Sequence, residues 1–167
     1  MQRSNKKVKN ATICKTNDIT FKSQLEKGIY NTLQQLNYDV KYEPRTFELW
    51  GSFTPLTPFY DRETDAQREK RVLEGSKEKS RLLTLKTSKI VGIRYTPDFY
   101  FRYKNIDVYI EAKGKENDVF YIKKKLFRKY LDDVYMSTKQ HSIFFEIHTK
   151  KQLLQALDIM KEYAESL

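Results

Sequence analysis

Two acidic residues and a lysine within one short stretch of the sequence could carry out phosphodiester hydrolysis. Asp98 follows Pro97, and Glu111 precedes Lys113 by two positions. Because side chains in a β-strand alternate between faces, Glu111 and Lys113 are expected to project to the same side. Mg²⁺ takes oxygen ligands, usually one or two carboxylates together with water and phosphate oxygens. These residue types therefore predict a divalent-metal site that activates water for attack on a phosphate.

The role expected of each residue follows from its chemistry. Asp98 and Glu111 would supply carboxylate ligands, and the main-chain carbonyl of Ala112 lies close enough in the chain to join them. Lys113 would orient or help to deprotonate the attacking water and would offset developing negative charge. A polar pair on an exposed hairpin is also common, so the spacing alone leaves a purely structural role open.

A β-hairpin is the element expected to position these residues. From Tyr95 to Lys115, two aromatic and aliphatic runs flank the polar pair Lys104-Asn105. Such a pattern is typical of two strands joined by a tight turn. The hairpin would bring the acid of its first strand close to the acid of its second strand.

An amphipathic helix is expected before the hairpin. Its apolar stripe consists of Phe21, Leu25, Ile29, Leu33 and Leu36, which recur at helical spacing. Thr20 or Asp18 would cap this helix, and Asn37 would end it. Glu26 faces the edge of the stripe. It is therefore either a boundary residue of the helix or a third acid beside the hairpin carboxylates.

The rest of the chain alternates between strand and helix patterns. The expected elements are strands at 38–43, 46–50 and 142–147, and helices that begin at Asn117 or Asp118 and at Thr149 or Lys150. The first of these helices carries basic residues that could contact a DNA backbone, namely Lys123, Lys124, Lys125, Arg128 and Lys129. Contacts of this kind hold a nucleic acid in place without reading its sequence.

Two charged segments lie outside this pattern. Residues 1–18 are polar and basic, and they are expected to form a flexible arm. At about 60–89, good helix formers followed by Gly75 predict a charged helical insertion. This insertion is either a solvated helix or a DNA-contacting element. The remainder of 19–167 is expected to form one domain.

The composition narrows the class of partner. Lys and Arg number 32 against 22 Asp and Glu, which gives a net charge of +10. Such a charge favours nucleic acid or an anionic membrane surface as the partner. No apolar run is long enough to span a membrane, and the single cysteine excludes an internal disulfide and a thiolate-rich zinc site. The sequence predicts a soluble, cytoplasmic protein that meets nucleic acid.

The motif resembles that of the PD-(D/E)xK nuclease superfamily. Pro97-Asp98 is followed, 13 residues after the aspartate, by Glu111-Ala112-Lys113, and Glu26 lies on the preceding helix. The resemblance implies a restriction-endonuclease-like α/β fold with an αβββαβ core, in which helices flank a central mixed sheet. It implies that Asp98, Glu111, the Ala112 carbonyl and Glu26 bind Mg²⁺ or Mn²⁺. Lys113 would assist the attacking water.

Within the superfamily, the chain looks most similar to Holliday junction resolvases of the archaeal and phage endonuclease I-like types. This resemblance implies a metal-dependent endodeoxyribonuclease that cleaves branched DNA as a homodimer, in recombination or repair. The charged insertion departs from the resolvase pattern. Two alternatives remain open, namely a restriction, repair or transposition endonuclease of the same fold, and a DNA-binding protein without catalysis.

Overall fold

The computed structural model describes residues 13–16, 19–114 and 118–167, except for the side chains of residues 15 and 16. Within these residues the chain is a mixed α/β protein with four helices and ten strands. In chain order they are β1 (Cys14–Thr16), β2 (Ile19–Phe21), α1 (Gln24–Gln35), β3 (Lys41–Tyr42), β4 (Phe47–Trp50), β5 (Tyr60–Arg62), α2 (Asp65–Leu73), β6 (Leu83–Leu85), β7 (Ile93–Tyr95), β8 (Phe99–Tyr103), β9 (Ile106–Ala112), α3 (Asp118–Thr138), β10 (His141–Ile147) and α4 (Lys150–Glu165). Residue contacts divide the chain into two units, Met1–Leu49 with Arg94–Leu167, and Trp50–Ile93.

A four-stranded mixed sheet forms the centre of the first unit. Its strand order is β10-β9-β8-β3, with β8 antiparallel to β9 and β10 parallel to β9. The β8–β9 pair confirms the predicted hairpin. Lys104 adopts φ 49° in its turn, a left-handed conformation that tight hairpin turns require.

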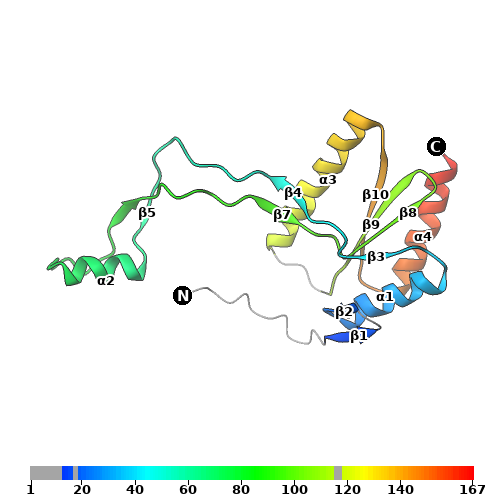
Figure 1. Ribbon diagram of the computed structural model, residues 1–167, viewed down its shortest axis with the longest axis horizontal. Coiled ribbons are helices and arrows are strands. Elements are labelled where there is room, and N and C mark those ends of the chain that lie inside the picture. The colour runs from blue at the N-terminus through cyan, green and yellow to red at the C-terminus, as the bar shows by residue number, and fades with distance from the viewer. Residues whose placement is uncertain (1–12, 17–18, 115–117) are drawn as a thin grey trace. The chain divides into compact units, whose positions relative to one another are not determined.

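The alternating side chains of the hairpin give the sheet two apolar faces. Ile106, Val108 and Ile110 of β9 pack with apolar residues of α1 and α4, whereas Tyr109 packs with Phe120 and Phe127 of α3. Helix α3 accordingly lies on one side of the sheet, and α1 and α4 lie on the other (Figure 1). The element order α1, β3, β8, β9, α3, β10, α4 is the helix and strand order expected from the sequence.

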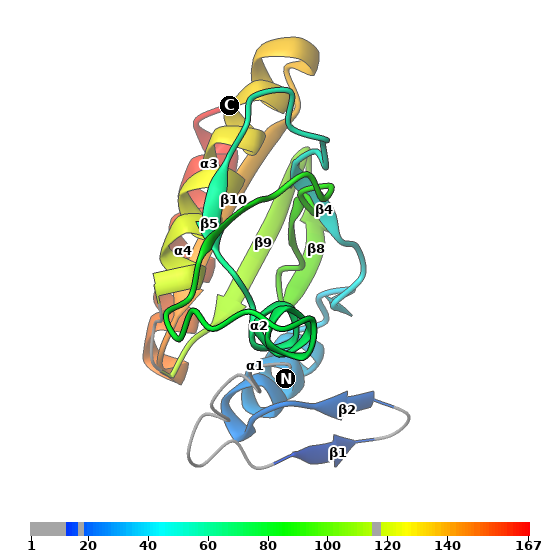
Figure 2. The same cartoon turned by 90° about the vertical axis from the view of Figure 1, so that its left-hand side faces the viewer.

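The start of α1 differs from the prediction. Ser23 is the N-cap, and its hydroxyl accepts a hydrogen bond from the main-chain N–H of Glu26. Thr20 is not the cap because it belongs to β2, which pairs with β1 beside α1 (Figure 2). Residues 14–16 are therefore a strand and not part of a flexible arm. The rest of that predicted arm, including Asp18, lies outside the described residues.

The ends of the other elements follow the sequence signals closely. Asn37 has φ 60° two positions after the last residue of α1, as expected of a residue that ends a helix. Asp118 is the first residue of α3, and Asn117 lies outside the described residues. Thr149 caps α4 through a capping box with Gln152. Of the predicted strand at 38–43, only β3 is regular, and β4 pairs with β7 instead of joining the central sheet.

The second unit is organised by polar contacts. It contains the insertion predicted at about 60–89, with the β5–β6 pair, helix α2 and Gly75 at φ 96° after the helix. Glu63 is its single buried residue. Both oxygens of Glu63 accept hydrogen bonds from Arg71, at 2.6 and 3.0 Å. Arg71 also donates to Ser76 Oγ and to the carbonyls of Glu78 and Ser80.

Candidate functional site

Antiparallel pairing of β8 with β9 brings the two predicted hairpin acids to one end of the sheet. Asp98 directly precedes β8, and its Oδ2 accepts a hydrogen bond of 2.8 Å from the Ala112 N–H at the end of β9. Glu111 is the residue before Ala112. Both carboxylates are enclosed, since Asp98 is 8% and Glu111 5% exposed.

The surroundings of the Asp98 carboxyl make it hard to ionise. Burial and the negative charge of Glu111 raise the pKa of Asp98 to about 8. Glu26 contributes in the same direction, whereas the Ala112 N–H and Lys113 act against the rise without cancelling it. Repulsion of this kind between buried acids is a frequent property of functional sites.

Glu111 is held by two donors. Lys113 Nζ donates to its Oε1 at 2.9 Å, which agrees with the expectation that both side chains lie on the same face. The Tyr95 hydroxyl donates to Oε2 at 2.7 Å. Burial and the charge of Glu111 raise the pKa of Tyr95, so this hydroxyl keeps its proton. The Lys113 ammonium also lies 3.8 Å from the ring centroid of Phe120, which fixes it between a carboxylate and an aromatic face.

Glu26 has a structural role as well as a candidate functional one. Its carboxylate accepts hydrogen bonds from Ser23 Oγ at 2.8 Å, the Lys22 N–H at 2.9 Å and the Tyr42 hydroxyl at 2.7 Å. Glu26 thus helps to cap α1, where a negative charge is favourable. It is buried, and its charge contributes to the raised pKa of Asp98. The third predicted acid therefore lies within the electrostatic reach of the hairpin pair.

The donor set fits a hard divalent cation in chemistry, because its atoms are carboxylate and carbonyl oxygens. A cation would also relieve the repulsion between Asp98 and Glu111. Of the two Asp98 oxygens, Oδ2 accepts the Ala112 N–H, and Oδ1 accepts no hydrogen bond from a described residue. As the side chains lie, however, no three His, Cys, Asp or Glu groups among the described residues are arranged to hold a metal ion.

The five basic residues predicted to contact DNA differ in their surroundings. Lys125, Arg128 and Lys129 are exposed on α3, and Lys123 is half-buried. Lys129 pairs with Asp133 one turn away. Lys124 instead points inward, and its Nζ donates to Glu146 Oε2 on β10 at 2.6 Å. The predicted set therefore consists of three exposed residues, the half-buried Lys123 and the inward-pointing Lys124.

Several residues of the site were not found from the sequence. Tyr95 and Tyr42 donate to Glu111 and Glu26, but neither belongs to a local motif. Glu146 lies directly opposite Glu111 in the parallel register of β9 and β10. The pattern Ser23-x-x-Glu26 is a capping-box signature, and it could have located both the cap and the reason for a glutamate at that position.

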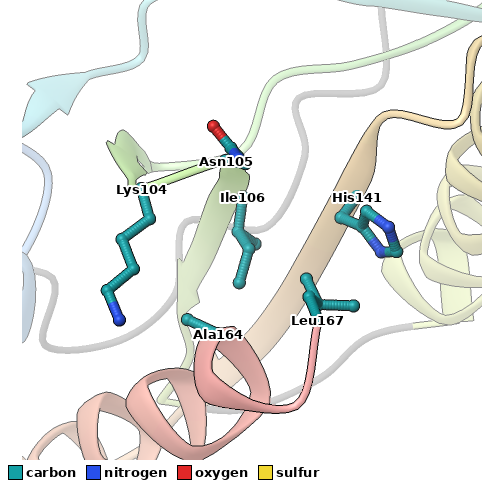
Figure 3. Close-up of a pocket in the computed structure, with 6 residues that line it drawn as sticks. All are labelled: Lys104, Asn105, Ile106, His141, Ala164 and Leu167. Atoms are coloured by element: carbon teal, nitrogen blue, oxygen red, sulfur yellow. The ribbon is translucent and has the colours of Figure 1, made fainter.

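A separate cavity lies at the other end of the sheet. It has a volume of about 230 Å³ and is lined by Lys104, Asn105, Ile106, His141, Ala164 and Leu167 (Figure 3). Ile106 and His141 are the first residues of β9 and β10, whereas the candidate acids lie where β9 ends. This cavity is thus not part of the acidic site.

No protein-family model matches the chain, and comparisons with curated proteins and with solved structures also returned no match. In the described part of the chain, none of the helices is both long enough and apolar enough to cross a membrane.

Proposed function

We propose that the protein is a metal-dependent endodeoxyribonuclease with a restriction-endonuclease-like fold, and that it cleaves branched DNA in the manner of a Holliday junction resolvase. One observation carries the proposal. Asp98 and Glu111 are both buried, burial and the charge of Glu111 raise the pKa of Asp98, and Lys113 contacts the Glu111 carboxylate. Such an arrangement lowers the stability of the fold, because two neighbouring buried carboxylates repel each other and lose hydration.

Each residue of the site has a part in hydrolysis. Asp98, Glu111, the Ala112 carbonyl and Glu26 would hold Mg²⁺ or Mn²⁺. When bound, the ion supplies an acidified water and polarises the scissile phosphate. Lys113 would orient the attacking water and stabilise the negative charge that develops on the phosphate. The water would lose a proton as its oxygen forms a bond to phosphorus, and the bond from phosphorus to the 3′ oxygen would break. The products are a 5′-phosphate and, once the leaving oxygen has taken up a proton from solvent, a 3′-hydroxyl.

The exposed basic residues of α3 would hold the substrate. Lys125 and Arg128 are exposed on that helix, and Lys123 is half-buried. Their contacts would be to backbone phosphates, so we expect weak sequence preference and strong dependence on salt. The proposal includes a homodimer that makes paired nicks, which equilibrium sedimentation of the full chain tests.

A second candidate function is DNA binding without catalysis. It is favoured by the fact that the side chains of the described residues do not form a three-ligand group for a metal ion. In this alternative, Glu26 is only a helix cap, and Tyr95 and Lys113 only satisfy Glu111. The positive net charge of the chain would then account for the whole activity.

A cleavage assay separates these functions and also tests the substrate shape. A four-way junction, a linear duplex and single-stranded DNA of matched length would be incubated with the full chain and Mg²⁺. We expect the junction to be cut fastest. Equal cutting of linear duplex would replace the resolvase proposal with another endonuclease of this kind, and binding to DNA without cutting of any substrate would favour the non-catalytic protein.

A further inference from the structure

A glutamate on β10 lies beside Glu111 of the candidate site. Glu146 of β10 is the register partner of Glu111 on β9. In a parallel pair, residues in register project to the same face of the sheet, so both carboxylates lie on the side covered by α3. The charge of Glu146 also contributes to the raised pKa of Tyr95, the tyrosine that donates to Glu111. Two neighbouring carboxylates on adjacent strands repel each other and lower stability.

Glu146 holds the inward-pointing side chain of Lys124. Its Oε2 accepts from Lys124 Nζ at 2.6 Å, and both side chains are largely enclosed, with 15% of Glu146 and 21% of Lys124 exposed. Its Oε1 lies 3.3 Å from His148 Nε2. The geometry of that contact is not that of a hydrogen bond, and Oε1 is buried with no hydrogen-bond partner in the described chain.

The aromatic ring of Phe120 brings this lysine close to the lysine of the motif. Lys113 Nζ lies 3.8 Å and Lys124 Nζ 5.4 Å from the centroid of the same ring. The two ammonium groups are therefore no more than about 9 Å apart, the sum of these two distances. One is held by Glu111 and the other by Glu146. The result is a pair of ammonium groups, each with its own carboxylate, at the end of β9.

We propose that Lys124 is a second substrate-contacting lysine of this site, which binds a non-bridging oxygen of the phosphate at the cleaved bond, and that Glu146 is the positioning residue that holds it there. This inference rests on the proposed nuclease function. The inference gives Lys124 a different role from Lys123 and Lys125, its neighbours on α3. Those two lysines would contact the DNA backbone away from the cleaved bond.

The free-energy cost of burying the Lys124–Glu146 ion pair agrees with a functional role for it. A buried ion pair contributes little to stability, because desolvation of the two charges offsets their attraction. An apolar pair at positions 124 and 146 would fill the same space between α3 and β10 without placing a carboxylate beside Glu111. A lysine ammonium has three N–H donors and can bind more than one oxygen acceptor at the same time.

Single-turnover cleavage compared with DNA affinity provides the test. For Lys124→Ala we expect the cleavage rate to fall by about 100-fold, the typical effect of losing one donor to a developing negative charge, with less than a threefold change in Kd. Lys151→Ala is the matched control. Lys151 is exposed on α4, on the side of the sheet opposite to α3, and we expect its loss to change neither the rate nor the Kd more than threefold.

A phosphorothioate substrate supplies a readout that a merely structural role would not move. Sulfur in place of one non-bridging oxygen at the cleaved bond should slow the wild-type protein, and this slowing should disappear in Lys124→Ala for one of the two diastereomers. The double variant Lys124→Ala/Glu146→Gln removes the buried charge left by the single variant, so it should fold as stably as the wild type and still cut slowly.

The outcomes distinguish this inference from the proposed function. If the wild-type protein cuts DNA and the cutting requires Asp98, but Lys124→Ala matches Lys151→Ala in rate and sulfur effect, the inference is wrong and the nuclease proposal stands. If the wild-type protein cuts no DNA, both are wrong.

Discussion

The variant Asp98→Asn should be more stable than the wild-type protein in alkaline solution, and it should lack the proposed activity. The pKa of Asp98 is raised from 3.8 to about 8 by burial and by Glu111. The folded protein therefore binds more protons than the unfolded chain between these two values, and the free energy of unfolding falls as pH rises from about 4 to about 8. In Asp98→Asn this fall is absent, because the amide does not ionise.

The size of the effect follows from the shift in the pKa. A rise from 3.8 to about 8 corresponds to at most about 6 kcal/mol, at about 1.4 kcal/mol for each pH unit. Water penetration and relaxation around a buried charge reduce such values, so we expect about 3 kcal/mol. The amide oxygen can still accept the Ala112 N–H, so the variant keeps the main-chain contact that Asp98 makes.

Urea unfolding at pH 5 and pH 9, without divalent ions, is the assay. Asp98→Asn should differ from the wild type by less than about 1 kcal/mol at pH 5, where Asp98 is protonated, and should be more stable by about 3 kcal/mol at pH 9. Asp132→Asn, at an exposed position of α3, is the control and should change stability by less than about 0.5 kcal/mol at either pH. An equal difference between wild type and Asp98→Asn at both pH values would refute the reasoning.

Three further predictions concern the site and the second unit. Mg²⁺ binding at pH 7 should release about one proton, because Asp98 must ionise to bind the ion. Calorimetry in buffers of different ionisation enthalpy measures this release, and a binding heat independent of the buffer would contradict it. Tyr95→Phe should lower the free energy of unfolding in urea by about 1–3 kcal/mol, because a buried oxygen of Glu111 loses its donor; an unchanged value would mean that the hydroxyl contributes nothing. Glu63→Ala should increase hydrogen exchange at the Leu82 N–H, which donates to Glu63 Oε1, by more than tenfold. The same exchange should be unchanged in Glu74→Ala, where the lost ion pair with Lys70 is exposed, and equal exchange in both variants would show that Arg71 and Glu63 do not organise this unit.

Local sequence signals predicted the parts of the fold that short-range forces determine. The β8–β9 hairpin was predicted from two apolar runs around Lys104-Asn105, and the start of α4 was predicted at Thr149 or Lys150, where Thr149 is the N-cap. The predicted start of α1 was wrong. The spacing of Phe21 continues the apolar stripe of the helix, but Phe21 belongs to β2 and pairs with β1. A strand pairing of this kind depends on a partner segment, which helical periodicity does not reveal.

In the candidate site, too, the local contacts were predicted and the contacts between distant segments were missed. The alternation of β9 predicted that Glu111 and Lys113 share a face, and they are hydrogen-bonded. Glu146 was missed because its position beside Glu111 depends on the parallel register of β10, which the intervening helix α3 makes possible. Tyr95 was missed for a similar reason. Its hydroxyl reaches Glu111 from β7, a strand outside the central sheet.

The central claim is that Asp98 and Glu111 form a centre for metal-dependent phosphodiester hydrolysis. Single-turnover cleavage of a four-way junction by wild-type protein and by Asp98→Asn, each with Mg²⁺ and with EDTA, tests it most directly. We expect cleavage only by the wild-type protein with Mg²⁺, at least 100-fold faster than by Asp98→Asn, while both proteins bind the junction and remain folded. Cleavage by Asp98→Asn at the wild-type rate, or undiminished cleavage in EDTA, would contradict the account.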